Sequence, residues 1–229
     1  MELSITLIII IITCIVSISA FSNHRIIDEL IFYPPAVTQL KQWYRFFSCG
    51  LIHGDYLHLI FNMYAFYTFG TNVENGTQYR DTVGRDNGFV QIFGQTEGKL
   101  LYLLMYVLAL GFCLLPTFAK HKNDYYYRSL GASGAVSAVI FAGLMLEPRT
   151  GVGLLFVPGV SIPGYIFAPL FLGISHFLAK RGRDNVNHSA HIWGALFGLV
   201  FIIAFSYALT DYDPIRGFIE GVKMDINGS

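Results

Sequence analysis

The chain is organised around residues 130–140, which read Leu-Gly-Ala-Ser-Gly-Ala-Val-Ser-Ala-Val-Ile. Ser133 lies near the start of an apolar segment, beside Gly131 and Gly134. Because glycine has no Cβ, another backbone or a substrate could approach the Ser133 hydroxyl closely. Gly, Ala and Ser are also the usual close-packing residues of membrane helices, so the same run could be a simple helix crossing. The catalytic interpretation is favoured only if another segment of the chain supplies a base for Ser133.

The composition indicates a membrane protein. Of the 229 residues, 54% are hydrophobic and only 13% are charged, and the mean hydropathy is +0.51. The formal net charge is zero, with 15 basic and 15 acidic residues, so nothing favours binding to nucleic acid. Cys14, Cys49 and Cys113 are widely spaced and contain no CxxC pair, which argues against disulfides and zinc–thiolate sites. The expected partners are the lipid bilayer and apolar segments of other proteins, with no cofactor.

Apolar runs predict one all-α membrane domain over residues 1–229 with six spanning helices. The expected spans are 3–21, 51–72, 100–118, 131–146, 163–178 and 190–209. The first has the length needed to cross about 30 Å of hydrocarbon. A signal peptide is the competing interpretation, but no Lys or Arg precedes this run. Residues 73–98 are predicted to be a solvated connection without a readable motif, and residues 210–229 a polar tail.

Residues 22–50 cannot lie against lipid as a bare helix, because they mix prolines, aromatic rings and charges. Trp43, Tyr44, Phe46 and Phe47 form a tight aromatic group there. Such a group predicts a loop that rests in the membrane interface. An ordinary belt of interfacial aromatic residues explains the same rings.

The second expected span contains polar residues that are costly at membrane depth and usually face a protein interior or a water-filled cavity. His58 and Asn62 are four residues apart and therefore share one helical face. They could point two hydrogen-bond donors toward one place. They could equally be polar contacts between helices.

The sixth expected span supplies a base for Ser133. It reads Asn187-His-Ser-Ala-His-Ile-Trp-Gly-Ala-Leu-Phe-Gly198, which places His191, Gly194 and Gly198 on one helical face. A glycine face lets this helix press against the small residues of the fourth span. The two helices could then hold His191 within hydrogen-bond reach of Ser133, as activation of a serine nucleophile requires. No carboxylate is positioned to orient the imidazole, so the expected arrangement is a dyad.

These motifs together resemble the rhomboid family of intramembrane serine proteases. The matching features are Gln42-Trp43-Tyr44-Arg45, His53, His58 with Asn62, Gly131-Ala132-Ser133-Gly134, and Ala190-His191 with Gly194 and Gly198. Their order and spacing cover the chain from the first span to about residue 205. The resemblance implies a six-helix rhomboid-like bundle in which Ser133 is the nucleophile and His191 the general base. It further implies that the substrates are transmembrane proteins.

The resemblance also assigns supporting residues. His58, Asn62 and the Ser133 backbone N–H would form an oxyanion hole. Trp43 and Arg45 would hold the loop after the first span as a membrane-embedded hairpin, the L1 loop. A loop near residues 180–190 would cap the site. As in bacterial relatives, we expect a multi-pass protein of the cytoplasmic (inner) membrane.

Two features depart from the family pattern. Many members carry an aromatic residue four positions after the serine, where this chain has Ser137, so either another ring substitutes or His191 is held less firmly. Of the Lys and Arg residues in the loops, six are expected on the side of the membrane that holds Met1 and nine on the opposite side. That bias opposes the positive-inside rule if the amino terminus is cytoplasmic.

Two other functions are compatible with parts of the sequence. A catalytically inactive rhomboid-like protein would bind transmembrane clients without cutting them, although the serine, the histidine and both side-chain donors are present. A membrane metalloenzyme could use His53, His58, His188 and His191, but the chain has no HExxH motif and no clear carboxylate ligand. No metal site is therefore expected.

Overall fold

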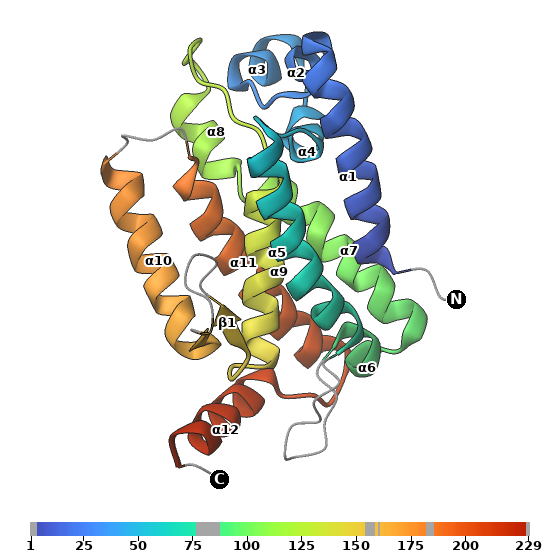
Figure 1. Cartoon of the computed structure of the whole chain (residues 1–229), viewed down its shortest axis with the longest axis vertical. Helices are drawn as coiled ribbons and strands as arrows, with labels where there is room; N and C mark the ends of the chain where they lie inside the picture. Colours follow the sequence, from blue (N-terminus) through green and yellow to red (C-terminus); the bar gives the residue numbers. More distant parts are fainter. Residues whose placement is uncertain (1–3, 77–87, 154–158, 160, 182–185, 228–229) are drawn as a thin grey trace.

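A computed structural model describes residues 4–76, 88–153, 159, 161–181 and 186–227 of the chain. The fold is a bundle of helices, with smaller helices at both ends (Figure 1). The long helices are α1 (Ile5–Ser22), α5 (Tyr56–Asn75), α7 (Gln95–Phe112), α9 (Ser133–Leu146), α10 (Gly164–Arg181) and α11 (His188–Leu209). The short ones are α2 (His24–Leu30), α3 (Pro34–Leu40), α4 (Arg45–Ser48), the 3-10 turn η1 (Cys49–Leu51), α6 (Phe89–Phe93) and α8 (Leu115–His121).

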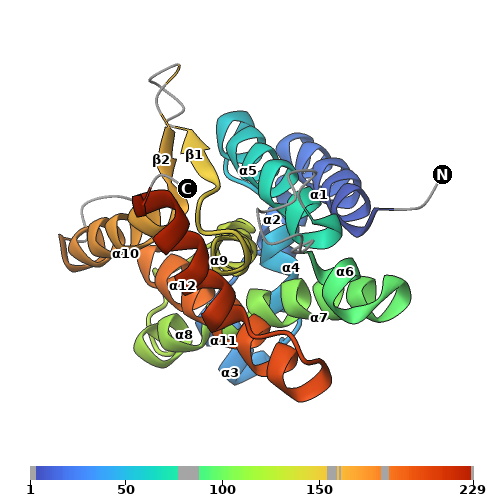
Figure 2. The same ribbon diagram turned by 90° about the horizontal axis from the view of Figure 1, so that it is seen from below.

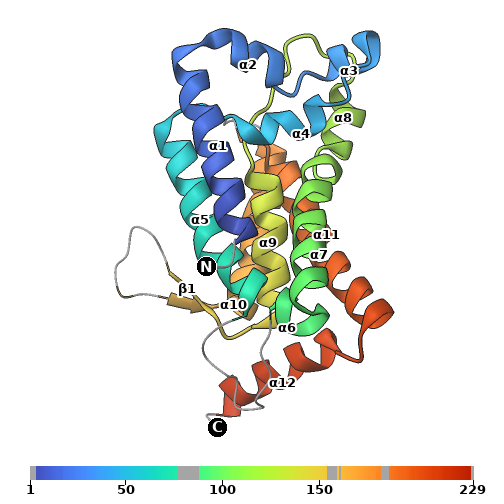
Figure 3. The ribbon, with the colours of Figure 1, turned by 90° about the vertical axis from the view of Figure 1, so that its right-hand side faces the viewer.

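Three further elements, two strands and a helix, lie at the end of the bundle opposite α2 and α3 (Figure 3). Strands β1 (Gly151–Gly153) and β2 (Ser161–Pro163) pair antiparallel, with Val152 opposite Ile162. Helix α12 (Pro214–Asn227) occupies most of the segment expected to be a polar tail.

Helices cover all six segments in which spans were expected. Three helical segments are long and apolar enough to cross a membrane by length and composition, namely Ile5–Ser22, Gln95–His121 and His188–Leu209. Helix α9 is apolar but shorter, and α5 and α10 do not meet the same criterion. The chain is therefore a helical membrane protein, and the count of six spans remains a proposal.

Local chemistry shifts several expected boundaries. Helix α5 begins at Tyr56 rather than near residue 51, because the Asp55 carboxylate accepts the backbone N–H of His58 (2.8 Å) and caps the helix. The third expected span, 100–118, is divided between α7 and α8. Pro116 lies in the first turn of α8, where its missing N–H costs nothing, and the helix continues to His121.

Helix α9 lies at the centre of the bundle, surrounded by α5, α7, α10 and α11 (Figure 2). Eleven of its fourteen residues are buried, so this helix meets protein on every side rather than lipid. It tolerates such burial because it contains no charged residue and many small ones, which let the neighbouring helices approach. The position of Ser133 at its first residue places the serine at one end of the core.

Some sequence expectations fall on parts of the chain outside the described residues. These parts include the start of the first span, most of the polar connection at 73–98 with Arg80 and Arg85, and residues 182–185 of the expected cap loop. The described remainder of the connection contains α6, whose Phe89 is buried against Tyr102 of α7.

Candidate active site

Helices α9 and α11 meet through their small residues. Gly194 has no room for a Cβ because the carbonyl group of Gly134 lies against it, and Gly198 meets Ala138 in the same way. Only glycine at these two positions allows the two backbones to touch. The contact is the one that the glycine face of the sixth span predicts.

This contact brings Ser133 and His191 together. His191 Nε2 lies 2.8 Å from Ser133 Oγ, which is hydrogen-bonding distance, and both residues are half-buried. Because Ser133 is the first residue of α9, its side chain lies at the start of the helix, where it lines a cavity. A histidine in this position can take a proton from the hydroxyl.

The start of α11 is fixed by a side chain that the sequence did not single out. The Asn187 Oδ1 atom accepts the backbone N–H of Ala190 (3.1 Å) and caps the helix. The Asn187 amide also bonds to the Thr117 hydroxyl of α8, at 3.1–3.2 Å. The first turn of α11, which contains His191, is thereby tied to α8. An Asn before a periodic apolar run is the signal that could have identified this cap.

Phe171 supplies a ring beside His191, where many family members use an aromatic residue at the position of Ser137. Its centroid is 6.2 Å from that of His191, with 33° between the planes, and it comes from α10. The Ser137 hydroxyl instead donates to the backbone carbonyl of Ser133 (2.8 Å). The His188 ring also meets the His191 ring edge-on, with centroids 5.7 Å apart. The imidazole of His191 thus has ring neighbours from α10 and from its own helix.

A cavity of about 670 Å³ adjoins the pair. Ser133, His191, His58 and Asn62 all contribute to its wall, so the structure brings the four predicted site residues to one space. Hydrogen bonding indicates how His58 is oriented. The Gly54 N–H lies 3.4 Å from His58 Nδ1, which makes Nδ1 an acceptor and assigns the proton of the neutral ring to Nε2. The Nε2–H group of His58 lies on the side of the ring that faces Gly131.

Asn62 is buried one turn below His58. One hydrogen of its amide is given to the His58 backbone carbonyl (2.9 Å), so a second hydrogen remains for another acceptor. Both α5 residues can therefore act as hydrogen-bond donors.

The backbone before Ser133 is held by a chain of hydrogen bonds through buried His53. The Ala132 N–H is 3.5 Å from His53 Nε2, and His53 Nδ1 is 3.0 Å from Ser17 Oγ. Ser17 in turn donates to the carbonyl of Leu51 (2.8 Å). With Nε2 as acceptor, the His53 proton lies on Nδ1 and points to Ser17. Sequence reasoning noted His53 but gave no role to Ser17.

Gly131 adopts a conformation that other residues avoid. Its φ is +109°, and a Cβ at this position would lie 2.8 Å from His58 Cε1. The glycine therefore lets the chain turn into α9 while the His58 ring lies directly against it.

The loop after α1 is organised by Arg45. Its guanidinium donates to the carbonyls of Asp28 (2.9 Å) and Ile31 (2.7 Å) and to the side chain of Gln42 (2.6 Å). Trp43 is more exposed and packs beside Phe46, with ring centroids 6.2 Å apart. The two residues predicted to hold this loop thus make different contacts, one polar and internal, the other apolar and at the surface.

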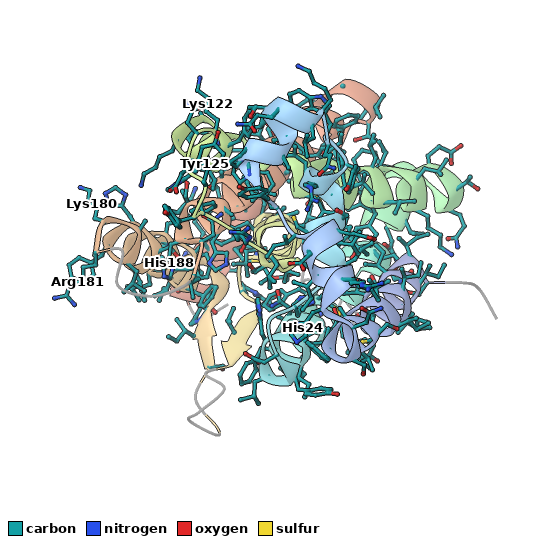
Figure 4. The ribbon with its side chains drawn as sticks, turned by 90° about the horizontal axis from the view of Figure 1, so that it is seen from above. His24, Lys122, Tyr125, Lys180, Arg181 and His188 are labelled. Carbon is teal, nitrogen blue, oxygen red and sulfur yellow. The ribbon has the colours of Figure 1, made fainter. Side chains whose placement is uncertain are left out.

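The end of the molecule nearest the cavity carries charges at its periphery. Figure 4 shows Lys122, Lys180 and Arg181 pointing outward, whereas His188 lies nearer the centre. Within the described part of the chain, no group of three or more His, Cys, Asp or Glu side chains is placed to hold a metal.

Comparison with known proteins identifies the family of this chain. A profile described as the Rhomboid domain matches residues 40–208. The chain belongs to the rhomboid family. The match includes Ser133, His191, His58, Asn62 and His53, whereas Ser17, which supports His53 from α1, lies outside it.

Curated relatives of this rhomboid-family chain include three from plants and mammals. RHOMBOID-like protein 12, mitochondrial, of Arabidopsis thaliana is 26% identical over 62% of this chain and 40% of its own length. Rhomboid-like protein 15 of the same plant is 26% identical over 80% of this chain and 41% of its own length. Presenilin-associated rhomboid-like protein, mitochondrial, of Rattus norvegicus is 25% identical over 66% of this chain and 35% of its own length.

The chain thus aligns with less than half the length of each of these relatives. Two of the three are named as mitochondrial, which does not favour the bacterial inner membrane that the sequence led us to expect. A membrane location itself is supported by the family and by the apolar helices.

Proposed function

We propose that this rhomboid-family protein is an intramembrane serine endopeptidase that cleaves transmembrane segments through a Ser133–His191 dyad. The observation that carries the proposal is the 2.8 Å hydrogen bond between His191 Nε2 and Ser133 Oγ beside a cavity. A serine hydroxyl is a weak nucleophile until a neighbouring base can accept its proton. Neutral imidazole suits that role because it can take the proton and return it near neutral pH.

In the proposed reaction, Ser133 Oγ bonds to the scissile carbonyl carbon while its proton passes to His191 Nε2. The tetrahedral intermediate then breaks its C–N bond, and His191 gives the proton to the leaving amine. A water molecule attacks the acyl-enzyme with His191 as base. Collapse of the second intermediate releases the carboxyl product and returns the proton to Ser133 Oγ.

Three donors are available for the oxygen that becomes negative in this reaction. They are His58 Nε2–H, the second amide hydrogen of Asn62, and the backbone N–H of Ser133. The last belongs to the first turn of α9, whose N–H groups have no acceptor within the helix. Donors aimed at developing charge in a site shielded from water stabilise the transition state strongly.

The substrate would be a transmembrane helix that enters sideways and unwinds near small or helix-breaking residues. Unwinding is needed because the carbonyls of an intact helix are already hydrogen bonded and shielded. We further propose that α1, α5, α7, α9, α10 and α11 all lie within the bilayer, with the Arg45-centred loop embedded at one surface. The polar side chains of the cavity would then admit the water that hydrolysis consumes.

The test is cleavage of a panel of single-span substrates reconstituted in liposomes. Wild type should cut at least one of them, and Ser133→Ala should not. Ser19→Ala is the matched control, because Ser19 is exposed on α1 and bonds only to a carbonyl of its own helix in the described structure. Cleavage at the same bond by Ser133→Ala would contradict the assignment.

A fluorophosphonate probe separates an enzyme from a member that only binds transmembrane clients. An adduct that forms on wild type and is absent from Ser133→Ala would support catalysis. Client binding without any Ser133-dependent adduct would point to the non-cutting protein.

A further inference from the structure

Helix α12 presents three distinct faces. Pro214, Phe218, Gly221 and Asp225 recur at spacings of four, three and four residues. The residues one position later form a second row with the same spacings, Ile215, Ile219, Val222 and Ile226. The residues two positions later form a third row, Arg216, Glu220, Lys223 and Asn227. Since consecutive helical residues are rotated by about 100°, each row is a separate stripe along the helix.

The first stripe faces the bundle. The helix lies across the end of the bundle formed by α9 and α11 (Figures 1 and 2). Phe218 packs against the hydrophobic core, and a Cβ on Gly221 would lie 2.8 Å from Pro148 Cγ. The Asp225 carboxylate accepts the hydroxyl of Tyr165 (2.9 Å). These contacts fix the rotation of α12 about its own axis.

With this rotation fixed, the second stripe points sideways and the third points away from the bundle. The isoleucines of the second stripe are left accessible in the described structure, with exposed fractions of 42% for Ile215, 46% for Ile219 and 69% for Ile226. The third stripe is polar, and Arg216 and Glu220 form an ion pair across one turn (2.8 Å). An apolar side and a charged side on one surface helix are typical of helices that lie in the plane of a membrane interface.

The start of α12 is tied to the end of α11. Asp213 accepts the N–H of Arg216 (2.9 Å) and the hydroxyl of Tyr207 (2.6 Å). These two bonds lower the pKa of the Asp213 carboxyl, so it stays ionised at neutral pH as an N-cap. The last turns of α11 expose Tyr207 and Leu209, and this helix is long and apolar enough to cross a membrane. Helix α12 therefore begins within a few residues of the membrane boundary.

We propose that α12 is an in-plane membrane anchor whose isoleucine stripe contacts the boundary between lipid headgroups and acyl chains. Lipid fits better than a protein partner because α12 begins at Pro214, five residues after the candidate membrane span His188–Leu209 ends. The charged row then lies on the water side, as the interface requires. The charges of the four charged residues of α12, which are Arg216, Glu220, Lys223 and Asp225, sum to zero. A neutral phosphatidylcholine surface should therefore be sufficient for binding.

The test places nitroxide spin labels on the two stripes of the full chain in phosphatidylcholine vesicles. Single substitutions Ile219→Cys and Ile226→Cys label the apolar stripe, and Lys223→Cys and Asn227→Cys label the polar one. All four are made in a Cys14→Ala background, and that background alone measures any labelling of buried Cys49 and Cys113. Accessibility to oxygen, which concentrates in lipid, is compared with accessibility to a water-soluble nickel chelate.

The ratio of oxygen to nickel accessibility should be several-fold higher at positions 219 and 226 than at positions 223 and 227. Equal ratios at all four positions would overturn the proposal. Spin–spin broadening at position 219 that disappears on dilution with unlabelled protein would assign the stripe to a second copy, and would also overturn it. An unchanged unfolding midpoint verifies that each labelled variant is folded. None of these outcomes depends on proteolytic activity.

Discussion

Gly194 of α11 lies directly against the carbonyl group of Gly134 in α9, one residue after the serine. The distance between these two backbones decides how far His191 is from Ser133, because each side chain belongs to the same turn as its glycine. A change in this contact should therefore act on the dyad without touching either of its members.

We expect Gly194→Ala to reduce cleavage by about 100-fold or more, since displacement of reacting groups by about 1 Å can cost that much. The measurement is kcat for a single-span substrate in liposomes. Gly173→Ala is the matched control, because a Cβ on Gly173 of α10 would meet no atom within 4 Å among the described residues. Wild-type activity in Gly194→Ala would show that the glycine contact does not position the dyad.

Phe171 should contribute to the orientation of the His191 ring. Phe171→Ala removes the neighbouring ring at 6.2 Å and should lower kcat about two- to thirteenfold, the range expected from an aromatic contact of about 0.5–1.5 kcal/mol. KM should change little. Leu170→Ala removes an exposed side chain of the same helix and should leave kcat unchanged. Equal losses in the two variants would mean that α10 is only generally disturbed.

Asn62 should stabilise the transition state rather than bind the substrate. Asn62→Ala is expected to lower kcat by about 10²- to 10³-fold, the usual cost of losing one oxyanion donor. Asn75→Ala is the control, because Asn75 also donates to a carbonyl of α5 one turn earlier (3.4 Å) but lies at the far end of the helix. A rise in KM with unchanged kcat in Asn62→Ala would argue against the proposed role.

Glu74 should be important for stability although it lies far from the serine. Its fully buried carboxylate accepts four hydrogen bonds from the start of α1, two from backbone N–H groups and two from the Ser4 and Thr6 hydroxyls, all at 2.8–2.9 Å. Removing the acceptor leaves buried donors unpaired, which costs about 1–3 kcal/mol for each such group.

We therefore expect Glu74→Ala to lower the thermal unfolding midpoint in detergent clearly, whereas Glu29→Ala on exposed α2 should leave it nearly unchanged. Because Glu74 joins α5 to α1, the loss should appear as early release of α1 in hydrogen exchange. Protection of α1 equal to wild type would contradict this interpretation.

Particular residues show how far the sequence could be read. The glycines of the sixth span pointed to Ser133 because their spacing selects one helical face, and that face must meet small residues. By contrast, Phe171 could not be assigned to His191, since nothing in the spacing of residues 163–178 tells which ring points inward.

The sequence by itself determined the helical membrane class, the family motifs, and the identities of Ser133, His191, His58 and Asn62 as candidates. These follow from hydropathy and from periodicities that act within one segment. Only the tertiary structure decided the 2.8 Å distance within the dyad, the ring beside His191, the His53–Ser17 support and which face of α12 packs on the bundle. Each of these depends on the rotation and depth of helices far apart in the chain, which packing sets and no local pattern encodes.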